Sequence, residues 1–356
     1  MNKRHYIIPI FVSHRGCPHD CIFCNQKKIT GSGGDVSGDE VKSKIEEYLK
    51  TIPKENTHIE LAFFGGSFTA IPIEQQKELL GAVQSYLKQG VISNIRISTR
   101  PDCINEEVIE ILKLYGVKIV ELGVQSMDEE VLKLSNRGHS TEDVVNAITL
   151  LKQRGFTVGV QVMVGLPGDT EEKSIDTVQK LVALKPHIAR IYPALVIRNT
   201  YMEQMYYKGL YKPFSLEKTI EICKRLLIIF EKNNIEVIRI GLQPTENIVE
   251  GKEVVAGPFH PAMRQLVVAA IYRDMLVYII SSMMPIDNVE IHINPKEISD
   301  IIGQKRTNIE YLRERFNIRN VAVIQTSTID KQSIIVKSGE NMRKMSLKDL
   351  YNVLEK

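Results

Sequence analysis

Three cysteines near the N-terminus are the most specific chemical feature of the sequence. Cys17, Cys21 and Cys24 are spaced as C-x3-C-x2-C, which places three thiol groups on one short loop. Three thiolates can hold three corners of a cubane iron-sulfur cluster, so the fourth iron has no protein ligand. An open coordination position favours chemistry over electron storage, as it does when catalytic zinc sites are compared with structural ones. The spacing therefore predicts a reactive four-iron cluster.

Structural zinc is the alternative for these thiols. His14 or His19 could supply a fourth ligand. Zinc-binding loops, however, usually pair two C-x2-C or similar units, and this sequence has one such cluster. The iron-sulfur interpretation is therefore favoured.

The two remaining cysteines, Cys103 and Cys223, stand apart, and two thiols are too few for an auxiliary cluster. Cys223 falls on an amphipathic helical pattern and is interpreted as a core residue. Cys103 follows the loop Thr99 to Asp102, where a thiol could donate a hydrogen atom, but packing is the favoured interpretation. Clustered thiols without a disulfide framework favour a reducing compartment, so we expect a cytoplasmic protein.

The composition is that of an ordinary globular protein. The chain has 356 residues, of which 43% are hydrophobic, and 46 Lys and Arg face 43 Asp and Glu. The hydrophobic fraction excludes disorder of the whole chain, and the near balance of charges excludes a strongly basic arm. The apolar stretch 266–284 contains Arg273 and Asp274, so no membrane span is expected. The apolar run 6–12 is interpreted as a first strand and not as a signal peptide.

Alternating strands and helices must position the cysteine loop. Apolar runs predict strands at 6–12, 59–64, 95–99, 119–124, 157–164 and 187–196, with amphipathic helices at 38–51, 73–90, 105–115, 128–134, 141–154 and 170–184. Such alternation implies right-handed crossovers and a parallel α/β sheet, here a partial (β/α)6 TIM-like barrel. Chemistry is then expected on the loops that follow the strands, and the cysteines do follow the first strand. A helix at 216–233 and a strand near 235–240 complete this domain, assigned to residues 1–240. A connecting loop and helix occupy 241–285.

The cysteine spacing, the aromatic Phe23 before the last cysteine, and the position after a first strand together resemble the radical S-adenosylmethionine (SAM) superfamily. That resemblance implies a 4Fe-4S cluster whose open iron chelates SAM and whose electron cleaves it to a 5′-deoxyadenosyl radical. It also implies an external reductant such as ferredoxin or flavodoxin. SAM contacts are implied for a set of residues on the expected loops: Phe23, Gly65, Gly66, Ser67, Ser98, Gln125, Arg137, Gln161 and Gly165.

Later motifs resemble one branch, the radical domain of the Elongator catalytic subunit, which modifies tRNA wobble uridine. They are STRPD at 98–102, ELGVQS at 121–126, NRGH at 136–139 and IYPALVIRNT at 191–200. The resemblance covers about residues 5–240. His139, Tyr192 and Arg198 could face the barrel mouth and are assigned to substrate handling; a strand-end aromatic is the alternative for Tyr192, and a surface charge for Arg198. It departs at Ser98, where the family has Glu. Nothing after residue 240 resembles the family's acetyltransferase domain, so we expect no acetyl-CoA site on this chain.

The C-terminal segment, residues 286–356, has a strand-helix-helix-strand-strand-helix pattern that resembles a KH domain. In such α+β domains a G-x-x-G loop clamps a nucleic-acid backbone. Here the loop would be Gly303 to Arg306, with Lys305 and Arg306 as RNA contacts and Arg306 in place of the second glycine. A small docking domain with Gly303 as a helix C-cap is the alternative.

The function expected from these observations is a radical SAM enzyme acting on RNA, with tRNA as the expected partner. Two alternatives stay open at this point. One is a radical SAM enzyme acting on a small molecule or tetrapyrrole, and the other is a non-catalytic RNA-associated iron-sulfur sensor. The role of the loop 257–261, as a cap over the site or as a simple turn, is also open.

Overall fold

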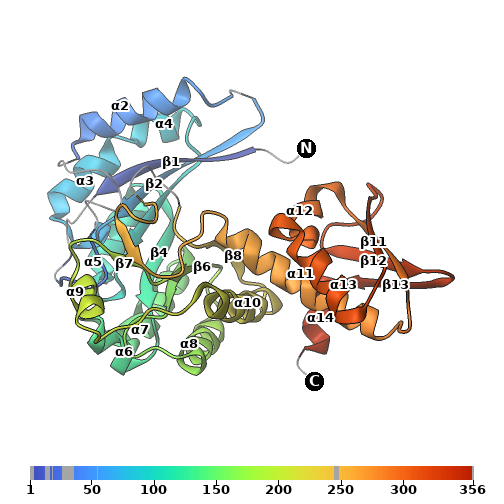
Figure 1. The fold of residues 1–356 in the computed structure, drawn as a ribbon. Coiled ribbons are helices and arrows are strands. Elements are labelled where there is room, and N and C mark those ends of the chain that lie inside the picture. The colour runs from blue at the N-terminus through green and yellow to red at the C-terminus, as the bar shows by residue number, and fades with distance from the viewer. Residues whose placement is uncertain are drawn as a thin grey trace. The chain divides into compact units, whose positions relative to one another are not determined.

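The computed structural model describes residues 4–12, 17, 19–25, 36–53, 55–243 and 248–354. They form two compact units (Figure 1). Unit 1 lies within residues 1–215 and 233–259, and unit 2 within residues 216–232 and 260–356. His14, one of the two possible zinc ligands named above, lies outside the described residues.

Unit 1 is built on a parallel seven-stranded sheet with the strand order β1-β2-β3-β4-β5-β6-β8. This confirms the expected parallel half-barrel, and β8 is the strand expected near 235–240. The central strands β2 to β6 are mostly buried, whereas β1 and β8 at the two edges are buried at fewer positions. The strands are β1 (Arg4–Val12), β2 (Thr57–Gly65), β3 (Asn94–Thr99), β4 (Val117–Gln125), β5 (Thr157–Val164), β6 (Ile188–Pro193) and β8 (Glu236–Ile240).

Helices connect successive strands of this sheet and flank it in Figure 1. They are α2 (Gly38–Leu49), α3 (Ile73–Gly81), α4 (Gln84–Lys88), α5 (Glu106–Leu114), α6 (Glu129–Leu134), α7 (Thr141–Gln153) and α8 (Glu171–Leu184). Most begin at a polar cap: Ser37 and Ser140, for example, accept from the N3 backbone N–H in reciprocal capping boxes. The single helix expected at 73–90 is two helices, since α3 ends at Gly81.

Short elements surround the carboxyl ends of the strands. They are the 3-10 turns η1 (Phe68–Ala70) and η2 (Pro101–Cys103), the helix α9 (Tyr201–Tyr207), and the antiparallel pair β7 (Val196–Ile197) and β9 (Val254–Ala256). Met202 of α9 packs with Ile22 of the cysteine loop, and the Met202 N–H donates to the Ile22 carbonyl at 2.9 Å. These elements therefore brace the loop that carries the cysteines.

Unit 2 has a four-stranded sheet with the order β11-β10-β12-β13. Strands β10 (Asn288–Ile293) and β11 (Asn320–Gln325) are parallel, whereas β12 (Ser333–Ser338) is antiparallel to both β10 and β13 (Asn341–Ser346). The helices are α10 (Leu216–Lys232), α11 (Met263–Ser281), α12 (Ile298–Ile302), α13 (Thr307–Phe316) and α14 (Leu347–Val353), with the 3-10 turns η3 (Pro295–Glu297) and η4 (Gln304–Arg306).

Two features of unit 2 differ from the sequence expectation. Strand β13 was not expected, because its sequence NMRKMS is polar and mostly exposed. Helix α10 was expected in the first domain but groups with the C-terminal elements, where Lys224 pairs with Asp274 of α11 at 2.6 Å. The KH-like assignment and the domain bounds 1–240, 241–285 and 286–356 stay predictions. Within the described part of the chain, no helix has the length and apolar character needed to cross a bilayer.

Candidate functional site

A cavity at the carboxyl ends of the parallel strands brings the cysteine loop together with residues from β2 to β5. Its volume is about 820 Å³, which includes the solvent at its mouth. All three cysteines of the motif line it. The lining residues are Cys17, His19, Asp20, Cys21, Phe23, Cys24, Gly65, Gly66, Ser98, Thr99, Arg100, Gly123, Gln125, Arg137 and Gln161.

The cysteine loop is held by the segment that follows α6. The Asn136 side-chain amide donates to the Asp20 carbonyl at 2.8 Å, and the Ile22 N–H donates to the Ser135 carbonyl at 3.2 Å. Within the loop, the Cys24 N–H donates to the Cys21 carbonyl at 3.0 Å. The contacts with Asn136 and Ser135 link residues more than a hundred positions apart, so tertiary structure positions the cysteine loop.

Arg137 connects this loop to the sheet. Its Nη1 donates to the Cys21 sulfur at 3.3 Å and its Nη2 to the Gly123 carbonyl at 2.6 Å. Burial raises the pKa of the Cys17 thiol and neighbouring Cys21 raises it further, while the Arg137 guanidinium opposes both. The site therefore supplies positive charge where thiolates are needed.

Gly123 makes room for the side chains that line the cavity above β4. A Cβ at this position would lie 2.8 Å from Arg137 Nη2 and 2.9 Å from Gln125 Nε2. Gln125 itself has φ 69° at the end of β4, in the left-handed region that non-glycine residues rarely adopt. The β4–β5 register shifts between Gly123 and Gln125. Gln125 lines the cavity at this irregular end of the strand.

Arg100 lines this cavity and is a buried cation with one unpartnered nitrogen. Its side chain is 2% exposed and forms a bidentate pair with Asp102 at 2.9 and 2.8 Å. Its Nη1 has no hydrogen-bond partner among the described residues. Burial lowers the pKa of Arg100, but the bonds to Asp102 outweigh this and raise it, so the group stays charged. A buried guanidinium N–H without a partner is costly unless a ligand accepts from it.

The glycine-rich loop after β2 offers backbone to the cavity. Gly65 has φ 106°, and a Cβ there would lie 3.0 Å from the Val12 carbonyl oxygen. The Gly66 N–H donates to that same carbonyl at 2.8 Å. Ser67 does not line the cavity: its hydroxyl contacts the Thr99 hydroxyl at 2.8 Å and accepts from the Arg100 N–H at 3.2 Å. Ser67 therefore fixes the next loop.

A layer of buried charges lies one side-chain row below the cavity, toward the amino ends of the strands. Glu121 of β4 accepts from Arg190 of β6, from Arg96 of β3, and from Gln161 of β5 at 3.1 Å. Arg96 also pairs with Glu60 of β2 at 2.7 Å. Burial alone would raise the pKa of Glu121, but Arg190 and Arg96 outweigh it and lower the pKa. Gln161 joins this charged layer to the cavity.

Besides Ser67, four residues with expected roles do not line the cavity. Arg198 is exposed and its Nε donates to the Lys252 carbonyl at 3.1 Å. Tyr192 lies on β6, where its hydroxyl interacts with Arg190. Gly165 forms a turn with φ 86°. His139 donates from Nε2 to the Val124 carbonyl at 3.2 Å, and burial lowers its pKa to about 3, so it is a neutral buried imidazole.

The isolated cysteines have different surroundings. Cys223 is fully buried in α10, as the core interpretation expected, and burial raises its pKa to about 12. Cys103 is partly buried in η2, and burial raises its pKa too. It lies outside the cavity lining, and its carbonyl accepts from the Thr69 hydroxyl at 2.6 Å.

Sequence reasoning missed five lining residues: His19, Asp20, Thr99, Arg100 and Gly123. A signal existed for Arg100, since it occupies the loop directly after a predicted parallel strand. The signal for Gly123 was its place in ELGVQS, one strand period before Gln125. For His19, the structure places the imidazole against Gly138, where a Cβ would lie 2.2 Å from the ring.

The donor set fits an iron-sulfur cluster with bound SAM. All three thiols belong to residues that line the cavity. Gly123 and Arg100 line it too, and Arg100 Nη1 has no partner among the described residues. Soft thiolates select iron-sulfur clusters, and a free guanidinium donor suits a carboxylate such as that of SAM. Both groups thus have matching chemistry in the described residues.

Comparisons with known proteins agree with this chemistry. Residues 11–181 match the Radical SAM superfamily and residues 186–273 match the Radical_SAM C-terminal domain, and the two segments together cover more than half of the chain. A tRNA uridine(34) acetyltransferase of Methanocaldococcus jannaschii is 33% identical over 272 residues, covering 64% of this chain and 49% of that protein. An uncharacterized protein of the same archaeon is also 33% identical, over 58% of this chain and 66% of its own length.

Among solved structures, Methanocaldococcus infernus Elp3 with an N-terminal deletion matches with a TM-score of 0.62 and 27% sequence identity. That match covers 78% of this chain and 64% of the solved chain. The chain thus spans between about half and two thirds of the length of these relatives.

Proposed function

Because the chain belongs to the radical SAM superfamily, we propose that it is an enzyme that modifies RNA, with tRNA as its substrate. When bound, the superfamily's 4Fe-4S cluster and SAM supply an electron and a 5′-deoxyadenosyl radical. The observation that carries the proposal is the convergence of Cys17, Cys21 and Cys24 on one cavity with cationic and amide side chains around it. Among the cysteines that the structure describes, these three line the cavity, so they would hold three irons and leave one open.

The residues around the cavity are suited to orient SAM. Arg100 is held by Asp102 with its Nη1 unpartnered, which suits the SAM carboxylate. Gln161 uses its amide N–H groups on Glu121 and, at 3.5 Å, on Ser98. Its carbonyl oxygen is therefore the group available to accept from the SAM amino group. This arrangement compensates for the absence of a glutamate at position 98.

The tRNA assignment is supported by relatives and by one loop of unit 2. A relative that is 33% identical acts, by its name, on tRNA uridine 34. In unit 2, Lys305 and Arg306 are exposed and directly precede α13, whose first residue is Thr307. No side chain caps the first turn of this helix. Cations beside the N-terminus of a helix form a surface suited to a phosphate.

The backbone of this loop departs from ordinary geometry. Gly303 has φ 74°, and Lys305 and Arg306 have φ 52° and 65°, in the left-handed region. Such a conformation costs a non-glycine residue on the order of 1–3 kcal/mol. Arg306 thus keeps the backbone conformation that a glycine would adopt while adding a cation. We interpret this strain as retained for a backbone contact with RNA.

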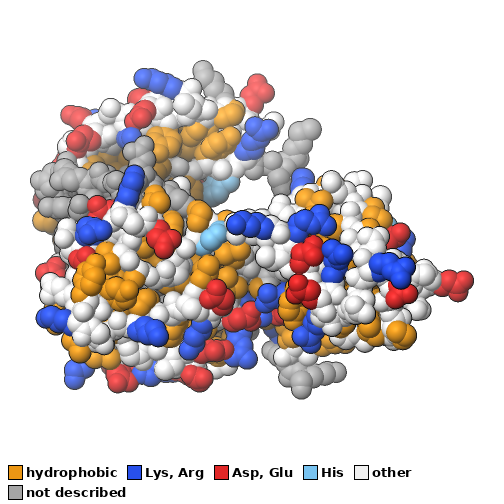
Figure 2. All heavy atoms as spheres, in the orientation of Figure 1, with side chains coloured by type: hydrophobic (Ala, Val, Ile, Leu, Met, Phe, Trp, Pro, Cys, Tyr) orange, Lys and Arg blue, Asp and Glu red, His pale blue; other side chains and the backbone are white. Residues whose placement is uncertain are grey.

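The local charge matters because the protein is not strongly basic. On the face drawn in Figure 2, Lys and Arg side chains are interspersed with Asp and Glu. The formal net charge of the chain is +3. Nonspecific attraction to RNA is therefore weak, and binding must come from local groups such as the loop 303–306.

Filter binding to total tRNA over a salt series tests the RNA assignment. In a Lys305→Glu, Arg306→Glu variant we expect weaker binding at every salt concentration and a shallower salt dependence, because phosphate contacts are lost. A Lys331→Glu, Lys348→Glu variant reverses two other exposed cations of unit 2 and serves as the matched control. SAM cleavage without RNA should equal the parent's in both variants.

Equal tRNA affinity and salt slope in the parent and the first variant would contradict the backbone contact. The C-terminal unit would then be a docking domain. If the parent itself binds no tRNA above the level of a neutral protein, the substrate is a small molecule or tetrapyrrole instead. Acetyl-CoA has no place in this proposal.

A further inference from the structure

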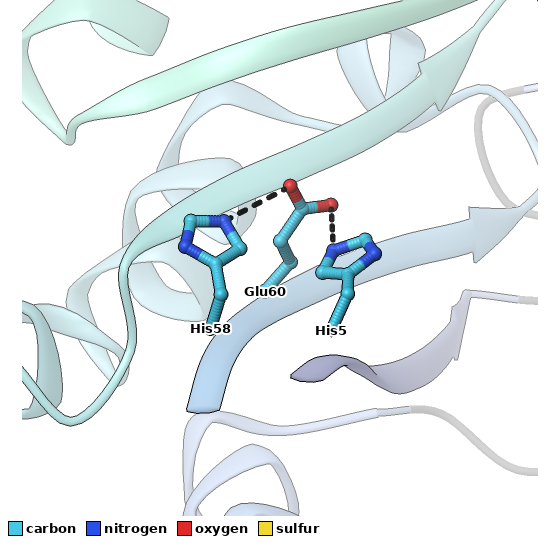
Figure 3. Close-up of side chains that lie close together, drawn as sticks. All are labelled: His5, His58 and Glu60. Atoms are coloured by element: carbon cyan, nitrogen blue, oxygen red, sulfur yellow. Dashed lines mark ion pairs between the residues drawn. The ribbon is translucent and has the colours of Figure 1, made fainter. Parts of the chain in front are cut away.

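We propose that His5, His58 and Glu60 bind a divalent transition-metal ion, with zinc as the best fit, at a site separate from the cysteine cavity. The three residues lie on β1 and β2 near the strands' amino ends (Figure 3). His5 and His58 are direct partners in the parallel register, and Glu60 follows His58 by two positions. All three side chains therefore project from the same face of the sheet. The cavity described above lies at the opposite, carboxyl ends of the strands.

The distance from each histidine nitrogen to its nearest Glu60 oxygen matches the distance between two ligands of a tetrahedral ion, and the two nitrogens face different oxygens of the carboxylate. His5 Nε2 lies 3.4 Å from Glu60 Oε2, and His58 Nε2 lies 3.5 Å from Glu60 Oε1. Zinc bonds of about 2.0–2.1 Å at tetrahedral angles place two ligand atoms roughly 3.3–3.4 Å apart. A charge-assisted hydrogen bond would be shorter, about 2.7–2.9 Å. The three candidate ligand atoms lie within 4.8 Å of one another.

Both imidazole rings are turned toward the Glu60 carboxylate in Figure 3. The ring centroids of His5 and His58 are 5.4 Å apart at an interplanar angle of 41°. The rings are therefore tilted and not stacked, and each directs its Nε2 toward one Glu60 oxygen. Two imidazole nitrogens and a carboxylate oxygen are a common set of zinc ligands that leaves a fourth position for water.

Neighbouring groups orient the Glu60 carboxylate and keep it ionised. Arg96 donates to Glu60 Oε2 from Nε at 3.1 Å and from Nη2 at 2.7 Å, which fixes the carboxylate plane. Burial alone would raise the pKa of Glu60, but Arg96 outweighs it and lowers the pKa, so the ligand is deprotonated at neutral pH. Metal sites typically have such partners around their ligands.

Access and charge balance are also favourable. The side chains of His5 and His58 are 47% and 38% exposed, whereas that of Glu60 is 6% exposed. An ion could therefore enter from solvent and keep a water ligand. Arg96 and Arg190 together face the two carboxylates Glu60 and Glu121, so this layer is neutral before an ion binds.

Zinc content and zinc coordination of the untagged, anaerobically reconstituted full chain test this site. In buffered micromolar zinc we expect one zinc per chain beyond the cluster iron. The extended X-ray absorption fine structure of zinc should show nitrogen and oxygen neighbours at about 2.0–2.1 Å, and no sulfur at about 2.3 Å. A His5→Gln, His58→Gln variant should lose this zinc and keep its iron. Its zinc affinity should fall by more than the roughly 10- to 100-fold seen when outer partners of a metal are changed.

His292→Gln is the matched control, since His292 Nε2 lies 3.5 Å from Glu290 Oε2 without a second histidine. It should retain the zinc. If the double variant folds poorly, as judged by lost iron, the two single variants decide by their zinc affinity. A parent that binds no zinc, zinc with sulfur neighbours, or unchanged zinc in folded His5 and His58 variants would each overturn the proposal and leave two ordinary histidine–glutamate pairs.

Discussion

Replacing Glu121 by glutamine should destabilise unit 1 far more than an ordinary change of charge. The side chain is 1% exposed and is the shared partner of Arg96 and Arg190. Glutamine has nearly the same shape, so the substitution removes charge without opening a cavity. It leaves two buried guanidinium groups short of negative charge and turns an amide N–H toward them.

Breaking a buried ion pair by removing one partner costs about 3–5 kcal/mol. Since about 1.4 kcal/mol changes an equilibrium constant tenfold, exchange through unfolding should accelerate by roughly 100-fold to a few thousandfold. The chain has no tryptophan, so intrinsic tryptophan fluorescence is not available. Hydrogen exchange measured by mass spectrometry on peptides from β3, β4 and β6 reports unit 1 directly.

Glu106→Gln is the matched control, because Glu106 pairs with Arg154 on the surface with 58% of its side chain exposed. Exposed pairs contribute about 0–1 kcal/mol, so exchange should change by less than about fivefold. If Glu121→Gln changed exchange in β3, β4 and β6 no more than this control does, the buried charge layer would not stabilise the sheet, and the reasoning would be refuted.

Three further outcomes follow from the same geometry. Gly123→Ala should weaken SAM binding about 10- to 100-fold in equilibrium dialysis, because the new Cβ displaces Arg137 and Gln125, and a lost charged hydrogen bond costs about 1.5–3 kcal/mol. In the control Gly81→Ala the new Cβ lies 3.9 Å from its nearest neighbour, so SAM affinity should not change, and equal affinity in both variants would contradict the close packing at Gly123. The pKa of Glu121 is lower in the folded than in the unfolded chain, so its contribution to stability is present above about pH 4.3 and is lost as pH falls through the folded-state pKa. The urea midpoint of unfolding should therefore fall more steeply from pH 6 to pH 2 for the parent than for Glu121→Gln, and parallel curves would argue against this linkage. Calorimetry should detect no saturable acetyl-CoA binding, because the sequence after residue 240 lacks a strand followed by a glycine-rich pyrophosphate turn; saturable binding would show that expectation to be wrong.

The sequence predicted the strands of unit 1 well because each is rich in apolar residues and most of the central ones are buried. It failed for β13, since a polar strand at the end of a sheet carries no such pattern and forms through its pairing with β12. The grouping of α10 with unit 2 also depends on tertiary contacts that periodicity cannot assign to a domain.

For the candidate site, the cysteine spacing located the cavity, because three ligands on one loop are a local feature. The positions of Ser67 and Arg198 were not predictable, since their partners Thr99 and Lys252 are distant in sequence. Arg100 was missed for a different reason. Its importance lies in a buried Nη1 without a partner on a residue that lines the cavity, and the sequence alone places it only on a loop.

The most direct test of the central claim is the formation of 5′-deoxyadenosine from SAM by the anaerobically reconstituted, reduced protein. We expect one four-iron cluster per chain and reductant-dependent production of 5′-deoxyadenosine. The Cys21→Ala variant should lose both, and Cys223→Ala, which changes a buried thiol of unit 2, should keep both. Stoichiometric zinc on the cysteines without iron-sulfur absorbance, or full SAM cleavage by Cys21→Ala, would contradict the claim.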